Sequence, residues 1–275
     1  LMAPILTLAQ SPDTKIKSRS LNMLGNFQSL LLEAEPVILG ALHSEQEEVI
    51  LQGLRVIRLH RISSSKLMNR LVELLHTQEL RLGEETAYTL MAMEAPFVVP
   101  ILLDHTSKDP SFQQNVWRIK VLGNFLNPQD PDPRILQNLL TGICDIPPGI
   151  KHEILRHLLL LLERAPSSLT QIAELLPEEM WLEFFKDSEW QVCEVATDFM
   201  SQYEILPGEY LLQELSTFPD WVIRIGIIRT LGKMRLYKRK AIPYFIQTLG
   251  DSQQEVCQSA LITLNKVGPP SSDST

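Results

Sequence analysis

The sequence predicts an all-α chain built from repeated helix pairs. Two observations predict this class. The first is a row of β-branched or leucine residues about 33 positions apart, each opening an amphipathic run after a polar turn: Ile16, Val49, Leu82, Val116, Ile150, Val192, Ile223 and Val256. Such a period is typical of repeat proteins, in which each unit buries its apolar face against its neighbours. The second is the scarcity of strand signals, because no Asn-Gly or Asp-Gly hairpin separates alternating segments.

Composition places the chain among folded proteins rather than disordered or membrane-spanning ones. Of its 275 residues, 44% are hydrophobic, which is ample for a buried core. The longest apolar run, 158–162, is far too short to cross a bilayer, and no segment resembles a signal peptide. The chain begins at Leu1 rather than at Met, so we expect it to be a piece excised from a longer protein.

The first repeated unit shows how a polar turn opens a helix. Asp13 lies in the turn, and Ile16 and Leu24 follow on the apolar face of the predicted helix. Later ladder residues open helices in the same way. The register is uncertain around Val116, because Lys120 would occupy the position that a small residue holds in the other units.

An insertion interrupts the period in the middle of the chain. Ile150 and Val192 are 42 residues apart, which indicates extra residues over 164–179. Pro166 and Pro177 lack a backbone donor and should break or kink helices there. We therefore expect this segment to be the least regular part of the chain.

The last two units show the pattern best. After the turn at Asp220, the apolar face continues through Ile223, Ile227 and Leu231. A helix is predicted over 241–249, with an apolar stripe made of Ile242, Phe245, Ile246 and Leu249. The turn 250–252 ends this helix and can cap the next one, whose apolar residues recur at Val256, Ala260 and Leu264.

This pattern resembles the HEAT-repeat (armadillo-like) family, whose units carry a turn Asp, then Val-Arg, a small residue and Leu-Gly. The motif is strict around Asp13 and Asp220 and partial around Asp187 and Asp251. The resemblance implies a right-handed α-solenoid of about eight antiparallel helix pairs, in which the second helix of each pair lines the concave face. Solenoids of this family mostly mediate protein–protein interaction.

The resemblance also sets expectations about domains and ion pairs. We expect one HEAT-like solenoid over 1–268, with the irregular insertion at 164–179, and a disordered tail or linker over 269–275. In the family, the turn Asp and the following Arg form an inter-repeat ladder, and the resemblance assigns Asp220 and Arg224 to it. Most other units hold a different residue at the Arg position, so a continuous ladder is not expected.

Two short motifs suggest chemistry but are better explained as parts of helices. His152 and His157 are five residues apart, which puts them about 140° apart around a helix, so one ion cannot bind both. The segment 63–66 matches a Ser-x-x-Lys pattern, but companion elements are missing, and Ser64 or Ser65 is expected to cap a helix. The sequence therefore predicts no catalytic residue, no metal, no cofactor and a non-enzymatic protein.

The cysteine pattern predicts free thiols. Cys144, Cys193 and Cys257 have no Cys-x-x-Cys spacing, and the last two occupy the same position of two different repeats. At helix-packing distances of about 10 Å per unit, these two would lie roughly 20 Å apart, too far for a disulfide. Reduced, buried thiols indicate a cytoplasmic protein or the cytoplasmic domain of a larger one.

The charges are segregated along the chain. The net charge is −8, yet seven basic residues and no acidic one lie between Arg224 and Lys240, while eight acidic residues and one Lys lie between Glu174 and Asp198. Grouped charges can steer a partner or an anion. The alternative is a merely solvated helix face, with some cations favoured by a helix C-terminus.

The basic run supplies the candidate binding residues. Arg224 is assigned to Asp220, so the candidates are the remaining cations and one aromatic anchor: Arg229, Lys233, Arg235, Lys238, Arg239, Lys240 and Trp221. Trp190 and Trp221 share a position two residues before a ladder residue. An aromatic at a repeated position either packs between units or anchors a partner on an exposed ridge.

We expect a scaffold or adaptor module that binds a protein or peptide, with an anionic surface as the partner that best suits the basic run. This expectation comes from the fold and not from a site. The second class is nucleic-acid binding of the kind found in HEAT-like DNA glycosylases, which have a basic groove. Some basic residues of this chain could form part of a similar groove: Arg55, Arg58, Arg118, Arg156 and Arg229. The acidic total argues against nucleic acid. A third class, the HEAT-like bilin lyases, has no specific support.

Overall fold

The computed structural model describes residues 2–27, 33–108, 115–127 and 132–268. These residues form 17 α-helices and no strand, which confirms the all-α prediction. None of these helices is both long and apolar enough to cross a membrane. The chain divides into two compact units, residues 1–127 and 128–275. The predicted tail, 269–275, lies outside the described residues.

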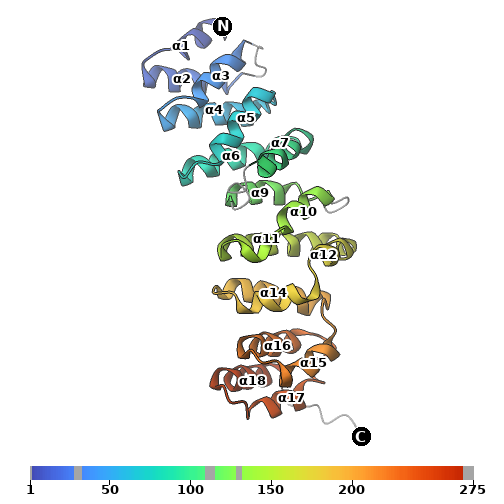
Figure 1. Cartoon of the computed structure of the whole chain (residues 1–275). Coiled ribbons are helices and arrows are strands. Elements are labelled where there is room, and N and C mark those ends of the chain that lie inside the picture. The colour runs from blue at the N-terminus through green and yellow to red at the C-terminus, as the bar shows by residue number, and fades with distance from the viewer. Residues whose placement is uncertain (1, 28–32, 109–114, 128–131, 269–275) are drawn as a thin grey trace. The chain divides into compact units, whose positions relative to one another are not determined.

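The N-terminal unit contains a row of helices packed one on the next, which are α2, α4, α6 and α9, with further helices against them. Helices α1, α3 and α5 pack on α2, α4 and α6, and α7 packs on α5 and α9 (Figure 1). The bounds are α1 Met2–Leu8, α2 Thr14–Leu24, α3 Ala34–Leu42, α4 Glu47–His60, α5 Ser65–Leu75, α6 Leu80–Met91, α7 Ala95–Lys108 and α9 Val116–Asn124.

The C-terminal unit contains a second row, made of α11, α14, α16 and α18, with α15 packed on α16 and α17 on α18. The bounds are α10 Pro133–Leu140, α11 Pro148–Arg164, α12 Leu169–Leu175, α13 Glu178–Glu183, α14 Trp190–Tyr203, α15 Gly208–Thr217, α16 Trp221–Lys233, α17 Ile242–Thr248 and α18 Gln254–Val267. Short 3₁₀ turns lie at Ile143–Asp145, Pro166–Ser168 and Phe184–Lys186. Helix α11 ends before Pro166, and Pro177 separates α12 from α13.

The repeated ladder marks helix starts. Each of the eight ladder residues lies in the first turn of a helix in one of the two rows. Val192, Ile223 and Val256 are completely buried, whereas Ile16 is 42% exposed. Its helix, α2, stands first in its row among the described residues, so one side of α2 has no neighbouring helix of that row. The buried apolar residues of α2 are Leu21 and Leu24.

Side-chain caps explain where several helices begin. Asp13, Asn115, Asp132 and Asp220 each accept hydrogen bonds from backbone N–H groups of the helix that follows. Ser64 Oγ accepts a hydrogen bond from the Leu67 N–H at 3.3 Å, so the Ser-x-x-Lys segment is a helix start, as expected. A cap of this kind contributes about 1 kcal/mol.

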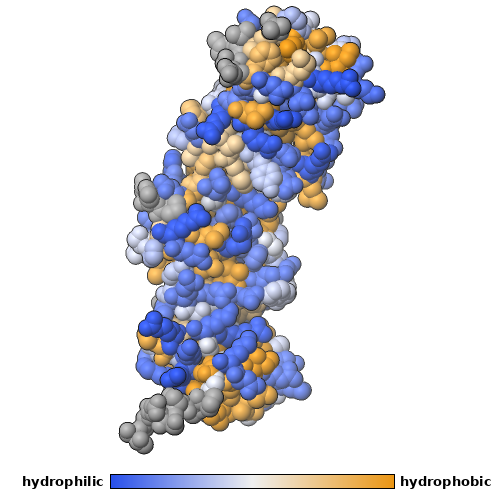
Figure 2. All heavy atoms as spheres, turned by 180° about the vertical axis from the view of Figure 1, so that it is seen from behind, coloured by the Kyte–Doolittle hydropathy of each residue, from blue (hydrophilic) through white to orange (hydrophobic). Residues whose placement is uncertain are grey.

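The stripe predicted on the helix over 241–249 is only half covered. Ile242 and Phe245 are buried, whereas Ile246 and Leu249 are exposed. Helix α17 is short and packs on α15 and α18. Figure 2 shows hydrophobic atoms gathered on the surface at the C-terminal end of the chain.

Candidate functional site

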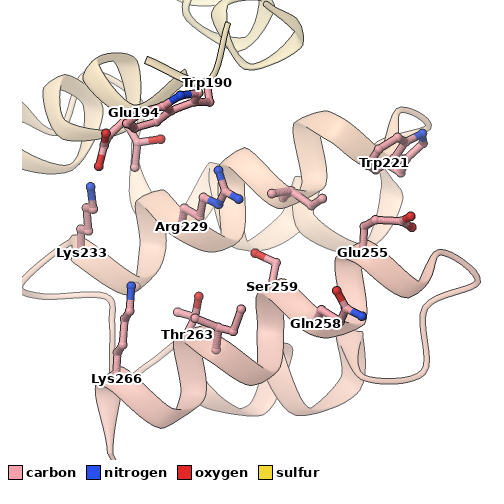
Figure 3. A pocket seen from close by; sticks show the side chains of 14 residues that line it. Trp190, Glu194, Trp221, Arg229, Lys233, Glu255, Gln258, Ser259, Thr263 and Lys266 are labelled. Atoms are coloured by element: carbon pink, nitrogen blue, oxygen red, sulfur yellow. The ribbon is translucent and has the colours of Figure 1, made fainter. Parts of the chain in front are cut away.

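An open pocket of about 540 Å³, here called the α16 trough, lies between the exposed faces of α14, α16 and α18. Its long axis is set by one stripe of α16, on which Trp221, Ile225, Arg229 and Lys233 follow one another at four-residue intervals (Figure 3). With a rise of 1.5 Å per residue, this stripe is about 18 Å long. The walls come from α14 and α18.

The sequence of α16 places a polar stripe opposite an apolar one. Ile223, Ile227 and Leu231 are completely buried and fix the helix on its neighbours. A glycine then brings α18 close, because a methyl group added at Gly232 would lie only 2.3 Å from Thr263 Cγ2. The trough is therefore narrow at this point, with Thr263 in its wall.

Both tryptophans of the repeated position line the trough. Trp190 is 65% exposed and Trp221 is 39% exposed, so they do not fill the space between units. The exposure of both rings argues against packing between units, and their role as anchors of a partner stays a prediction. Trp181, by contrast, is buried against Phe199, with ring centroids 4.6 Å apart.

The trough carries cations toward one end, where Glu194 of α14 also lines it. Figure 3 places Lys233 and Lys266 at the end opposite Trp221 and Glu255, with Arg229 between them. Lys233 Nζ bonds Asp198 Oδ1 at 2.6 Å, so an acidic residue of the 174–198 run neutralises it. Arg229 and Lys266 form no ion pair with the described residues, and both are exposed. A ligand could therefore reach two unneutralised cations.

The other predicted cations lie elsewhere. Arg235, Lys238, Arg239 and Lys240 belong to the turn 234–241 between α16 and α17, and none of them lines the trough. Lys240 Nζ lies 3.8 Å from Glu209 Oε1 and 5.0 Å from the centre of the Tyr237 ring. The continuous basic run of the sequence is thus divided by the end of α16, and only Trp221, Arg229 and Lys233 face the trough.

Arg224 has a different partner from the one predicted. Its Nε and Nη2 donate to the two carboxylate oxygens of Asp251 at 3.0 and 2.9 Å, whereas Asp220 caps its own helix through the Val222 N–H. The Asp220 carboxylate caps the start of α16, and the Arg224 side chain extends to Asp251 in the turn before α18. Burial opposes ionisation of Asp251, but hydrogen bonds from Arg224 and the Gln253 N–H outweigh it and lower the Asp251 pKa.

A second buried pair was not predicted. Lys151 Nζ lies 2.7 Å from Asp187 Oδ2, and both side chains are nearly excluded from solvent. Lys151 follows the ladder residue Ile150 as Arg224 follows Ile223, and each cation reaches the turn Asp that precedes the next helix of the row. This equivalence of position is the sequence feature from which the Lys151–Asp187 pair could have been predicted.

Of the five arginines that suggested a nucleic-acid groove, Arg229 lines the trough, and the other four are engaged within the protein or buried. Arg55 bonds Asn22 and Arg58 bonds Glu85, each at 3.0 Å. Arg118 is buried, and this burial lowers its pKa to about 10. Arg156 bonds Glu153 at 3.1 Å.

The two histidines do not converge on a metal. His157 Nε2 lies 3.3 Å from Glu153 Oε1, on the same helix as His152. Contact with His157, and after it with Arg156, lowers the Glu153 pKa to about 2 against the opposing effect of burial. Within 2–27, 33–108, 115–127 and 132–268, no group of three or more His, Cys, Asp or Glu is placed to hold a metal ion.

All three thiols are free, but they are less buried than expected. Cys144 is exposed, and Cys193 and Cys257 are half-buried. Cys193 Sγ donates to the Phe185 carbonyl oxygen at 3.4 Å, and burial is the main cause that raises its pKa. Burial also raises the pKa of Cys144, so Cys144 and Cys193 are weak nucleophiles rather than activated ones.

Comparison with known proteins adds little to this geometry. No protein-family model matches the chain, and no curated protein is similar to it in sequence. One solved structure, of an engineered protein, shares 12% sequence identity over 97% of this chain and 96% of that one, with a TM-score of 0.28. A TM-score this low carries no argument about the fold or the function.

Proposed function

We propose that the chain is a non-enzymatic interaction module, a HEAT-like α-solenoid of about eight helix pairs, whose α16 trough binds a segment of a partner protein. The solenoid is supported by the two rows of ladder helices and by the pairs Arg224–Asp251 and Lys151–Asp187, which join consecutive helices of one row. They resemble the inter-repeat ladder of the HEAT family.

The observation that carries the binding proposal is the exposure of Trp190 and Trp221 along one trough. Tryptophan is enriched at the centres of protein interfaces, where covering it contributes much of the binding free energy. An open trough of about 540 Å³, with two aromatic side chains and a few polar groups, suits a short segment of a protein.

Two other functions receive less support. Duplex DNA requires a continuous face of unpaired cations, but Arg55, Arg58 and Arg156 are engaged within the protein and Arg118 is buried. Binding to duplex DNA that weakens steeply with salt would favour this alternative. No described residue specifically supports a lyase. The free thiols agree with a reducing, cytoplasmic compartment.

The test is selection of displayed random peptides on the purified chain, followed by affinity measurement on the variants Trp190→Ala and Trp221→Ala. We expect each substitution to lower the affinity for the selected peptides at least tenfold, since truncation of an interface tryptophan typically costs about 2 kcal/mol or more of binding free energy. Tyr88→Ala, which removes an exposed aromatic side chain from α6, is the matched control. Equal affinity in all three variants would contradict the proposal.

A further inference from the structure

We infer that the occupant of the α16 trough is an extended peptide segment in which an apolar side chain and a carboxylate lie two residues apart, with the carboxylate on Arg229. This inference rests on the proposed function and adds the chemistry of the partner. Arg229, Ile225 and the polar side chains of α18 carry it.

The carboxylate is assigned by charge complementarity. Arg229 lies in the middle of the trough stripe without an ion-pair partner among the described residues, and Lys266 approaches from α18. Lys233, the third cation, already bonds Asp198. A guanidinium can hold a carboxylate through two parallel hydrogen bonds, which a single ammonium cannot do. We therefore assign the acidic side chain to Arg229 and a weaker, longer-range attraction to Lys266.

The spacing follows from the register of α16. Ile225 precedes Arg229 by four residues, which is about 6 Å along the helix. Ile225 and Trp221 form the apolar part of the same stripe. Successive residues of an extended chain are about 3.3 Å apart, so two residues of the segment span the distance from Ile225 to Arg229. The segment therefore carries its apolar and acidic side chains at positions i and i+2.

The polar wall favours an extended segment over a helix. Gln258, Ser259 and Thr263 line the trough from α18, and their side chains make no hydrogen bond to other described residues. An extended backbone presents free N–H and C=O groups that these side chains can satisfy, whereas a helix satisfies its own groups internally. Glu255, at the opposite end from Lys266, favours a basic residue at the far end of the segment.

The test uses the peptides selected on the wild-type chain, synthesised with a fluorescent label. We expect an enriched apolar-x-acidic pattern, and a dissociation constant that rises about tenfold on Arg229→Gln, since hydrogen bonds to charged groups contribute about 1.5–3 kcal/mol. Lys266→Gln should raise it about threefold, as exposed ion pairs contribute less. Replacing the peptide's acidic residue by its amide should cause no additional loss in Arg229→Gln.

Arg235→Gln is the matched control, because it removes the same charge from the turn outside the trough and should change the dissociation constant less than twofold. Equal weakening by Arg235→Gln and Arg229→Gln would overturn the inference in favour of general charge attraction. Selected peptides with apolar and acidic residues four apart would overturn the extended form. Peptides whose affinity falls on Trp190→Ala but not on Arg229→Gln would overturn this inference alone and leave the proposed function standing.

Discussion

Among the described residues, only the unit 128–275 buries ion pairs between neighbouring helices of a row, although it also has the exposed pair Lys233–Asp198. In the unit 128–275, Lys151–Asp187 and Arg224–Asp251 keep at most 13% of either side chain exposed. In the unit 1–127, Arg58–Glu85 is about one-third exposed, and Arg81–Glu47 is more exposed still. The partners lie about one repeat apart in all of these pairs.

The position of the acidic partner explains the difference. Asp187 and Asp251 are short side chains in turns, where each also accepts a backbone N–H bond, from Glu189 and Gln253. Glu47 and Glu85 are longer side chains on the helices α4 and α6. A similar sequence spacing therefore gives a buried pair when the acid lies in the turn and also accepts a backbone N–H, and a solvated pair when the acid lies on the helix.

The largest expected effect comes from removing one partner of a buried pair. Asp251→Ala should lower the free energy of unfolding by about 3 kcal/mol, because Arg224 would remain buried without a counter-charge. Glu85→Ala should cost less than about 1 kcal/mol, since its pair is partly solvated. Urea denaturation of the whole chain measures both. Similar losses of unfolding free energy in the two variants would show that burial does not determine how much each pair stabilises the chain.

A smaller effect is expected from glycines inside helices. A methyl group at Gly226 would lie 2.2 Å from the Phe185 ring, so Gly226→Ala should destabilise the chain by about 1–3 kcal/mol. Nothing lies within 4 Å of the same position at Gly40, so Gly40→Ala in α3 should stabilise it by about 0.5–1 kcal/mol. Thermal denaturation gives the sign of each change, and a destabilised Gly40→Ala would refute the packing argument.

The smallest effect concerns acid stability of the unit 128–275. The pKa of Glu153 is lowered to about 2 in the folded state, below its ordinary value of 4.5. The contribution of ionised Glu153 to the stability of the folded state is therefore complete above about pH 4.5 and is lost as the pH falls from there toward 2. Glu153→Gln should flatten the decline of the melting temperature over this range. An unchanged decline would mean that Glu153 contributes nothing.

The sequence predicted the helix starts well but not which faces are covered. The ladder spacing predicted the first turn of every helix in the two rows, because equivalent apolar positions recur along the sequence about once in each unit. It could not tell that Trp190 and Trp221 face solvent, since a period shows which residues are equivalent and not whether a neighbour covers them. The basic run similarly joined Arg229 to Arg235, although the end of α16 turns the chain between them.

The exposure of Trp190 and Trp221 also has an optical consequence. Indole fluorescence shifts toward shorter wavelengths when solvent is removed, and both rings line the trough where a ligand would lie. Trp181 is already enclosed, so its emission supplies a constant reference within the same spectrum. The chain can therefore report the occupancy of its own trough by its intrinsic emission, with no attached dye.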